Sequence, residues 1–292
     1  MTLNEINDDL GSAKPPYKVV ACLAVHGRLP LLKHTIQRLY VKNGCYRVIC
    51  SGDQREDKAL CESLGAVWVP YNNRFLGDKW NQSFLKAKDY NPDAVVFVGS
   101  SDWVCDDWFS IMQPYVEQHG FAGTPGCYLA DLGNVIRLVH WKGYKGYREE
   151  RADETIGSGR MLSRRLLDAI HWQPFKPTLN ASLDRSMKDL SKLKGYTDFM
   201  VHDERLKSLS ISTHLWPNKH NFDMHWGTHP RHYIPSTKMN PEPFISYHFP
   251  EINQLFESLP KPISHESEKS SARTVIESTA VAQPDRMQNL PL

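Results

Sequence analysis

The chain has 292 residues, of which 40% are hydrophobic and 11% aromatic, enough for one large α/β domain or two small ones. Its formal net charge of +2 does not by itself indicate nucleic-acid binding, although it leaves room for a local basic patch. Six cysteines without a CxxC pair predict buried free thiols in a reducing compartment. Because no apolar run approaches the roughly 20 residues of a membrane span, and the first 20 residues do not resemble a signal peptide, we expect a cytoplasmic protein.

The first hundred residues alternate between apolar runs and helix-like periodicity, after a polar leader over residues 1–16. Strands are expected, in chain order, at residues 18–25, 46–50, 66–70 and 94–98, and helices at 31–40, 56–64 and 80–88. Strands and helices that alternate at this spacing predict a doubly wound, mostly parallel α/β sheet.

Beyond residue 108 the pattern is less regular. Helices are expected at residues 109–119, 158–170 and 182–193, and loops or antiparallel strands at 121–138. After residue 259 large apolar groups are few, so residues 260–292 are predicted to be a disordered tail. We therefore expect one domain over residues 17–259, with a regular half (17–108) and an irregular half (109–259).

The stretch AVVFVGSSDWVCDDW, residues 94–108, carries the clearest local indication of a site. Its buried strand stops at Gly99, and Ser100 and Ser101 lead to Asp102 just past the carboxyl end. Ligands of open α/β sheets bind outside these strand ends, where a carboxylate can hold Mg²⁺ or Mn²⁺ against a diphosphate. The alternative is that Asp102 is only a turn or N-cap residue for the helix that follows.

Four landmarks follow this pattern in order. They are the strand end Ala24-Val25 with Gly27-Arg28, Asp53 after the second strand, the segment Gly77-Asp78-Lys79-Trp80-Asn81, and Val98-Gly99-Ser100-Ser101-Asp102-Trp103. Together they resemble the GT-A-type nucleotide-sugar glycosyltransferases, family two in particular, over residues 18–221. The fourth landmark is similar to the family's DxD region, with Gly99 and Ser101 where aspartates are often found. The resemblance implies a GT-A fold and transfer of a sugar from a nucleotide-sugar donor to a hydroxyl acceptor. It also implies that residues 17–259 are one catalytic domain, with residues 17–108 as its nucleotide-sugar half and residues 109–259 as its acceptor half.

The resemblance also implies which residues hold the donor. Asp53 matches the carboxylate that hydrogen-bonds the nucleotide base, and Arg28 and Lys79 would pair with the phosphates. Asp102 and His220 would hold Mn²⁺ or Mg²⁺ as a Lewis acid for the leaving diphosphate. A UDP-linked sugar is one expected donor. The complete set of implied donor contacts is Ala24, Val25, Arg28, Asp53, Lys79, Ser100, Ser101 and Asp102.

On the acceptor side, residues 157–165 resemble a glycine stretch that precedes a helix in this family. The acceptor-side residues implied are Gly159, Arg160 and Trp103. Residues 182–185 match the position of an acidic pair whose second member is the catalytic base, so Asp184 would take the proton of the acceptor hydroxyl, a step worth about 10²–10⁴-fold in rate. The resemblance favours inversion, whereas direct attack by Asp184 on the sugar would give retention.

Each of these residues also has a purely structural interpretation. Asp53 after Ser-Gly is typical of an Asx turn, and Lys79 of a solvated charge on a helix. Asp184 is also compatible with an exposed helix residue paired with Lys188 one turn later.

Two stretches mix basic and aromatic residues, 140–151 and 205–238, and the second holds five of the thirteen histidines. These histidines form no zinc motif, but we expect one of them near the diphosphate. Such mixtures suit sugars and also nucleic acid, so the acceptor is expected to be a saccharide or a hydroxylated DNA base. Two other functions fit the same fold: a nucleotidyltransferase, or a non-catalytic module that binds nucleotides or saccharides.

Overall fold

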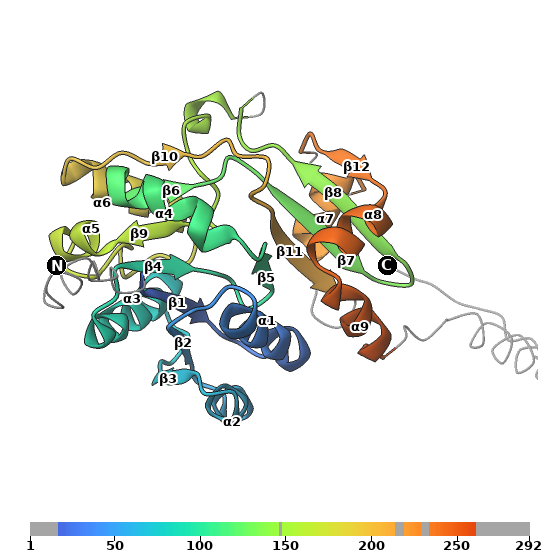
Figure 1. The fold of residues 1–292 in the computed structure, drawn as a ribbon, viewed down its shortest axis with the longest axis horizontal. Coiled ribbons are helices and arrows are strands. Elements are labelled where there is room, and N and C mark those ends of the chain that lie inside the picture. The colour runs from blue at the N-terminus through green and yellow to red at the C-terminus, as the bar shows by residue number, and fades with distance from the viewer. Residues whose placement is uncertain (1–16, 146–147, 214–218, 229–233, 261–292) are drawn as a thin grey trace, which may run out of the picture. The chain divides into compact units, whose positions relative to one another are not determined.

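The computed structural model describes residues 17–145, 148–213, 219–228 and 234–260 (Figure 1). The expected leader and nearly all of the expected tail lie outside these residues. The described part is a mixed α/β structure with two sheets. Figure 1 shows the first sheet on the left of the view and β7, β8, β11 and β12 of the second on the right.

Seven strands of the described chain form the first sheet. In spatial order they are β10 (Phe199–Met200), β6 (Phe121–Gly123), β9 (Met161–Ser163), β4 (Ala94–Phe97), β1 (Val19–Ala24), β2 (Arg47–Gly52) and β3 (Val67–Pro70). The strands β4, β1, β2 and β3 are parallel to one another, which confirms the alternating pattern predicted for the first hundred residues. β9 runs antiparallel to both of its neighbours, β4 and β6.

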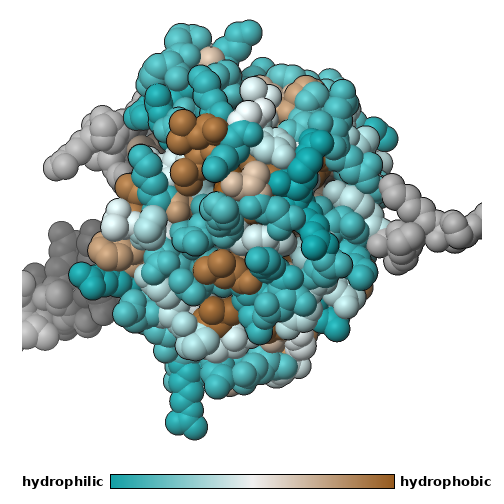
Figure 2. All heavy atoms as spheres, turned by 90° about the vertical axis from the view of Figure 1, so that its left-hand side faces the viewer, coloured by the Kyte–Doolittle hydropathy of each residue, from teal (hydrophilic) through white to brown (hydrophobic). Residues whose placement is uncertain are grey.

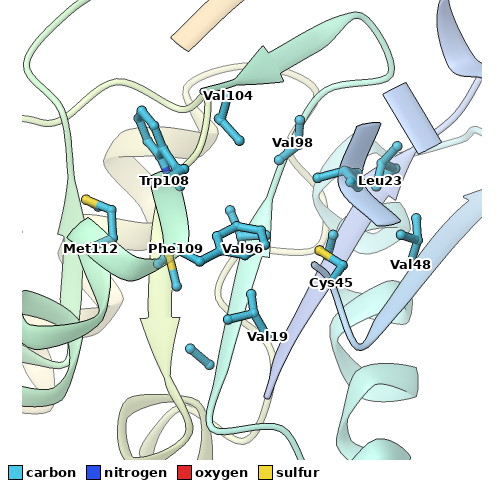
Figure 3. Packing of buried hydrophobic residues seen from close by; sticks show 14 of the residues in the cluster. Val19, Leu23, Cys45, Val48, Val96, Val98, Val104, Trp108, Phe109 and Met112 are labelled. Carbon is cyan, nitrogen blue, oxygen red and sulfur yellow. The ribbon is translucent and has the colours of Figure 1, made fainter. Parts of the chain in front are cut away.

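Helices cover both faces of this sheet, because alternate residues of its strands point to opposite sides. The helices of this half are α1 (Leu29–Val41), α2 (Arg55–Ser63), α3 (Leu76–Ala87) and α4 (Trp108–His119), with a 3₁₀ turn at Lys88–Tyr90. Val19 and Leu23 of β1 pack with α1 and α4, together with Val96 of β4 and Met112 of α4 (Figure 3). Val20 and Cys22 pack on the other face, against α3.

The helix predicted over residues 158–170 is correct only in its second half. Residues Met161–Ser163 form β9, and the helix α5 covers only Arg164–Ala169. The Ser163 hydroxyl accepts a hydrogen bond from the amide of Leu166 at 3.2 Å, which makes Ser163 the N-cap of α5. The apolar residues of this stretch satisfy helical spacing, but pairing with β4 and β6 takes the first of them into the sheet.

Five strands of the described chain form the second sheet. In spatial order they are β12 (Thr237–Met239), β8 (Ile136–Trp141), β7 (Cys127–Leu132), β11 (Ser208–Thr213) and β5 (Asp102–Val104). The antiparallel pair of β7 and β8 confirms the second of the two structures expected for residues 121–138. The half expected to be irregular therefore has a regular sheet. Its remaining elements are a 3₁₀ turn at Glu149–Arg151 and the helices α6 (Leu183–Leu193), α7 (Lys219–Trp226), α8 (Pro241–His248) and α9 (Glu251–Ser258).

The second sheet is also covered on both faces. Phe222 of α7 packs with Leu129 and Val139 on one face, and α8 and α9 pack with Leu138 and Leu209 on the other. The chain passes from the first sheet to the second between β4 and β5, at residues 98–101. This crossing places Asp102 at the junction of the two sheets.

On the face shown in Figure 2, hydrophobic residues are separated by hydrophilic ones. All six cysteines lie in the described part of the chain, where they are buried and free, as expected. Within the same residues, every helix is too short or too polar to cross a membrane.

Candidate active site

An open cavity of about 1020 Å³ lies at the carboxyl ends of β1 and β4, where the chain crosses to the second sheet. Many of the residues predicted from the sequence meet here. Those that line the cavity are Ala24, Arg28, Lys79, Ser100, Ser101, Asp102 and Asp184. They come together because the carboxyl ends of parallel strands share one edge of a sheet.

Arg28 is positioned by a tight turn after β1. Gly27 and Arg28 both have left-handed backbone conformations, with φ of 66° and 63°. The amide of Gly27 donates a 2.8 Å hydrogen bond to Oδ2 of Asp57, a fully buried residue of α2. Nη1 of Arg28 donates to Oγ of Ser101 at 3.1 Å, so the guanidinium links the ends of β1 and β4. Asp57 was not among the predicted residues, since nothing in its local sequence marks the long-range contact with Gly27.

Asp102 folds back over the turn that precedes it. Its backbone amide donates to the carbonyl of Gly99 at 3.0 Å, and its Oδ2 accepts from the amide of Gly99 at 3.2 Å. A Cβ at Gly99 would lie 2.6 Å from that Oδ2, which explains the glycine at this position. Asp102 is thus a turn residue that also lines the cavity. It is not the N-cap of the following helix, because α4 begins at Trp108 and its N-cap is Asp107.

Burial raises the pKa of the Asp102 carboxyl, while hydrogen bonds from Ser210, Gly99 and Ser158 and the charge of Arg28 act in the opposite direction. An acid whose pKa is raised by folding binds more protons in the folded state than in the unfolded state. The stability of the protein therefore falls as the pH rises from the ordinary value of 3.8 through the raised pKa of Asp102.

The isosteric substitution Asp102→Asn removes this pH-dependent loss of stability, and the amide oxygen of Asn can still accept the hydrogen bond from the amide of Gly99. We expect the variant to melt at a higher temperature than the wild type at pH 7, with a difference that narrows as the pH falls toward 4. Differential scanning calorimetry of both proteins across this pH range measures the effect. A variant that is equally or less stable at pH 7 would contradict the assignment of a destabilising charge to Asp102.

Lys79 is buried on the inner side of α3, with 3% of the residue exposed. Its ammonium donates to the carbonyl of Val25 and to Oδ1 of Asn73. Burial lowers the pKa of Lys79 to about 8, against smaller raising effects of Asp53 and Asp57. The interpretation of Lys79 as a solvated helix charge is therefore wrong. Since an ammonium has three N–H donors and two are used, one is left for a ligand in the cavity.

Asp53 lies beside the cavity and reaches it through Asn73. Nδ2 of Asn73 donates to Oδ1 of Asp53 and lies 3.2 Å from Nδ1 of His26, and both Asn73 and His26 line the cavity. Asp53 itself lines a smaller neighbouring cavity of about 410 Å³ that also contains Trp68. Asn73 therefore connects the proposed base-selecting carboxylate with the ammonium of Lys79, a role that its sequence position does not reveal.

Asp184 is held at the cavity by a buried arginine. Nη1 of Arg160 donates to Oδ1 of Asp184 at 3.1 Å, and Arg160 itself is fully buried. The other guanidinium donors of Arg160 bind Thr155, and Nη2 lies 3.9 Å from the buried carboxylate of Asp198. Asp198 also accepts from the amide and the hydroxyl of Thr155, at 2.8 and 2.7 Å. Arg160 thus positions Asp184 from behind instead of facing the cavity itself.

The alternative interpretation, in which Asp184 pairs with Lys188, is not what the structure shows, because Lys188 binds Asp153 at 2.6 Å. The backbone of Gly157 lies close to the carboxylate of Asp184. A Cβ at Gly157 would lie 2.8 Å from Oδ1 of Asp184. The glycine of the predicted acceptor-side stretch that matters for Asp184 is therefore Gly157.

Two predicted acceptor-side residues are not brought to the cavity. Trp103 is buried beneath α8 and α9, and its indole N–H donates to Oγ1 of Thr35 at 3.0 Å. Gly159 has a φ of +79°, and its carbonyl accepts from the indole of Trp108 at 2.9 Å. A Cβ at Gly159 would lie 2.5 Å from the Trp108 ring. Both residues therefore serve core packing.

Of the five histidines of the basic stretch, the structure describes the side chain of His225 alone, and this side chain lines the cavity. His225 is 3% exposed, its Nδ1 lies 2.9 Å from Oγ of Ser236, and burial lowers its pKa to about 4. His225 is therefore a neutral hydrogen-bonding group near pH 7. Tyr144 and Arg151, from the other basic and aromatic stretch, also line the cavity, with the guanidinium 3.8 Å from the ring centroid.

The expected metal depends on Asp102 and His220. The side chain of His220 lies outside the described residues, so its role stays a prediction. Among the described side chains, no group of three or more His, Cys, Asp or Glu residues is arranged to hold a metal ion. Around Asp102 the donors are one carboxylate and serine hydroxyls, so Mg²⁺ or Mn²⁺ fits only if substrate phosphates and water supply the other ligands.

No family model and no curated protein matches this sequence. Among solved structures, that of S. aureus TarS is similar, with a TM-score of 0.40 and 12% sequence identity. The alignment covers 68% of this chain and 35% of TarS, so the chain spans about a third of that protein. A likeness of this extent identifies no family, and the functional argument depends on the cavity.

Proposed function

We propose that this chain is a glycosyltransferase that moves a sugar from a nucleotide-sugar donor to a hydroxyl group of an acceptor, with inversion. The observation that supports this function is that one cavity contains both cationic groups and a carboxylate, Asp184, that a buried arginine holds in place. The cavity volume of about 1020 Å³ is at the upper end of the usual range for ligand sites, as a donor and an acceptor together require.

The cationic groups of the cavity would bind the diphosphate. Arg28 is oriented by Ser101, and Lys79 has one N–H that its two protein acceptors leave available. When the bond between the anomeric carbon and the diphosphate oxygen breaks, negative charge develops on that oxygen. Positive groups fixed beside it in a partly buried site stabilise this charge in the transition state.

Asp184 would act as the general base. Its Oδ1 is held by Arg160, and the carboxylate would accept the proton of the acceptor hydroxyl as the hydroxyl oxygen bonds to the anomeric carbon. Attack from the face opposite to the diphosphate gives inversion. A divalent metal bound at Asp102 together with the diphosphate would supply further charge neutralisation.

A thermal-shift panel of sugar nucleotides, with and without Mn²⁺, tests this function. We expect one donor at 100 times its Kd to add about 2.7 kcal/mol, or roughly 5–10 °C in Tm. We expect Mn²⁺ to increase the shift in the wild type and not in Asp102→Ala. If neither Mn²⁺ nor Asp102→Ala changes the shift in Tm that the donor causes, the basic residues alone bind the diphosphate. The absence of a shift with every donor would contradict the proposed function.

The lowered pKa of Lys79 predicts how donor binding depends on pH. The ammonium loses its proton above pH about 8, so donor affinity should fall by up to about tenfold per pH unit beyond that point. Titration calorimetry at pH 7, 8 and 9 measures this decline, which Lys79→Arg should abolish. The matched control is Lys86→Met, on the exposed side of the same helix, which should keep the wild-type profile. A wild-type affinity that stays constant up to pH 9 would refute the contact.

A further inference from the structure

A second cavity, of about 560 Å³, lies on the opposite face of the β7–β8 pair. Adjacent residues of a strand point to opposite faces. Cys127 and Trp141, which pair at the end of the ladder, line the main cavity, whereas their neighbours Tyr128 and His140 line the second. Tyr144 lines both cavities. Tyr144 therefore lies between the two cavities, just after the end of β8.

Three lysines line the second cavity, namely Lys142, Lys145 and Lys207. Among the residues that the structure describes, no carboxylate forms an ion pair with any of them. Burial lowers the pKa of His140, and the charges of Lys142 and Lys207 lower it further. Both ammonium groups thus place positive potential at the imidazole inside the cavity.

The acidic residues of the second cavity leave this positive charge largely unbalanced. Glu154 is bound by Arg151 at 2.6 Å, and Asp203 by Arg205 at 2.7 Å. Glu204 also lines the cavity, and the ammonium of Lys207 donates to its backbone carbonyl. Arg151 and Arg205 bind two of the three carboxylates, and the pKa of Asp203 is lowered by Arg205 and also by the charge of Lys207. With these two arginines counted, five cationic side chains stand against three carboxylates, so the net charge at the cavity is positive.

We propose that the second cavity binds the phosphodiester backbone of a nucleic-acid strand, one hydroxylated unit of which enters the main cavity and reaches Asp184. This inference names the acceptor and rests on the transfer reaction proposed above. Lysine ammonium groups are point charges suited to phosphate, and tyrosine is a side-chain type on which bases stack, although Arg151 covers one face of the Tyr144 ring. A neutral saccharide would leave the lysines without counter-charge, which makes it the less suitable acceptor.

The test is fluorescence anisotropy of the full chain with a labelled single-stranded oligodeoxynucleotide of ~12 nucleotides. We expect the triple variant Lys142→Ala, Lys145→Ala, Lys207→Ala to bind at least tenfold more weakly. Its slope of log affinity against log salt should be lower by about 2, since each lost phosphate contact removes about 0.7. The charge-matched control replaces Lys33, Lys88 and Lys194, three exposed lysines outside both cavities, and should behave as the wild type.

Four results would overturn the inference. The first is that the wild type does not bind the oligonucleotide, the second that both triple variants lose the same amount of affinity, and the third that neither loses any. The fourth result is that inorganic polyphosphate binds the wild type as tightly per phosphate as the oligonucleotide does. The donor thermal shift of the same proteins separates the two proposals. The lysine variant should keep the wild-type shift, which also shows that it is folded. If no sugar nucleotide stabilises the wild type while the oligonucleotide binds through the lysines, the transfer reaction fails and the strand site stands. If a sugar nucleotide stabilises the wild type but the oligonucleotide does not bind through the lysines, only the proposed strand site is overturned.

Discussion

Asp184→Asn is expected to lower kcat by about 10²–10⁴-fold while the Kd for the donor stays close to that of the wild type. Asn has the same shape and can still accept from Arg160 at the position of Oδ1, but it cannot take a proton from the acceptor hydroxyl. The loss therefore falls on the chemical step. Steady-state release of the nucleoside diphosphate measures kcat, and titration of the donor measures binding.

The matched control for this substitution is Asp189→Asn, an exposed carboxylate on the same helix, α6, which should leave kcat unchanged. Gly157→Ala tests the position of the carboxylate without altering its chemistry, because the added Cβ would lie 2.8 Å from Oδ1 of Asp184. We expect Gly157→Ala to lower kcat as well. Wild-type turnover by Asp184→Asn would remove the general base from the proposal, whatever the donor does.

Arg160→Met is expected to lower the free energy of unfolding by about 3–5 kcal/mol, the usual cost of breaking a buried ion pair from one side. The guanidinium is fully buried, and its removal takes away the cation that lies 3.9 Å from the carboxylate of Asp198, whose side chain is 1% exposed. Thr155 also loses its hydrogen bonds from Arg160. Urea denaturation followed by circular dichroism measures this loss.

A double variant and a surface control distinguish this cost from a general effect of losing an arginine. Adding Asp198→Asn to Arg160→Met removes the unpaired charge, so the double variant should recover part of the lost stability. Arg205→Met removes an exposed guanidinium that is paired with Asp203, and its stability should stay close to that of the wild type. If Arg160→Met costs no more than Arg205→Met, Arg160 does not form a stabilising buried ion pair with Asp198.

The sequence by itself determined the alternating strands and helices of residues 19–97, because apolar runs and helical periodicity report burial on one or both faces. It also determined which side chains follow the strands. Since parallel strands share their carboxyl edge, Arg28 and Asp102 were predicted to lie near one another without any knowledge of the contacts between them. The strand β9 was missed because its apolar residues satisfy helical spacing equally well.

Only the tertiary structure decided the contacts between segments that are far apart in the chain. Asp57 holds the turn before Arg28 from 30 residues away, and Asp198 binds Thr155 across 43. Trp103, which follows Asp102 in the sequence, was predicted to lie on the acceptor side. Asp102 lines the cavity, but the ring of Trp103 packs into the core. Periodicity reports that a face is buried, but it does not name the partner that buries it. The partners at the candidate site were therefore decided by the packing of segments that are distant in the chain.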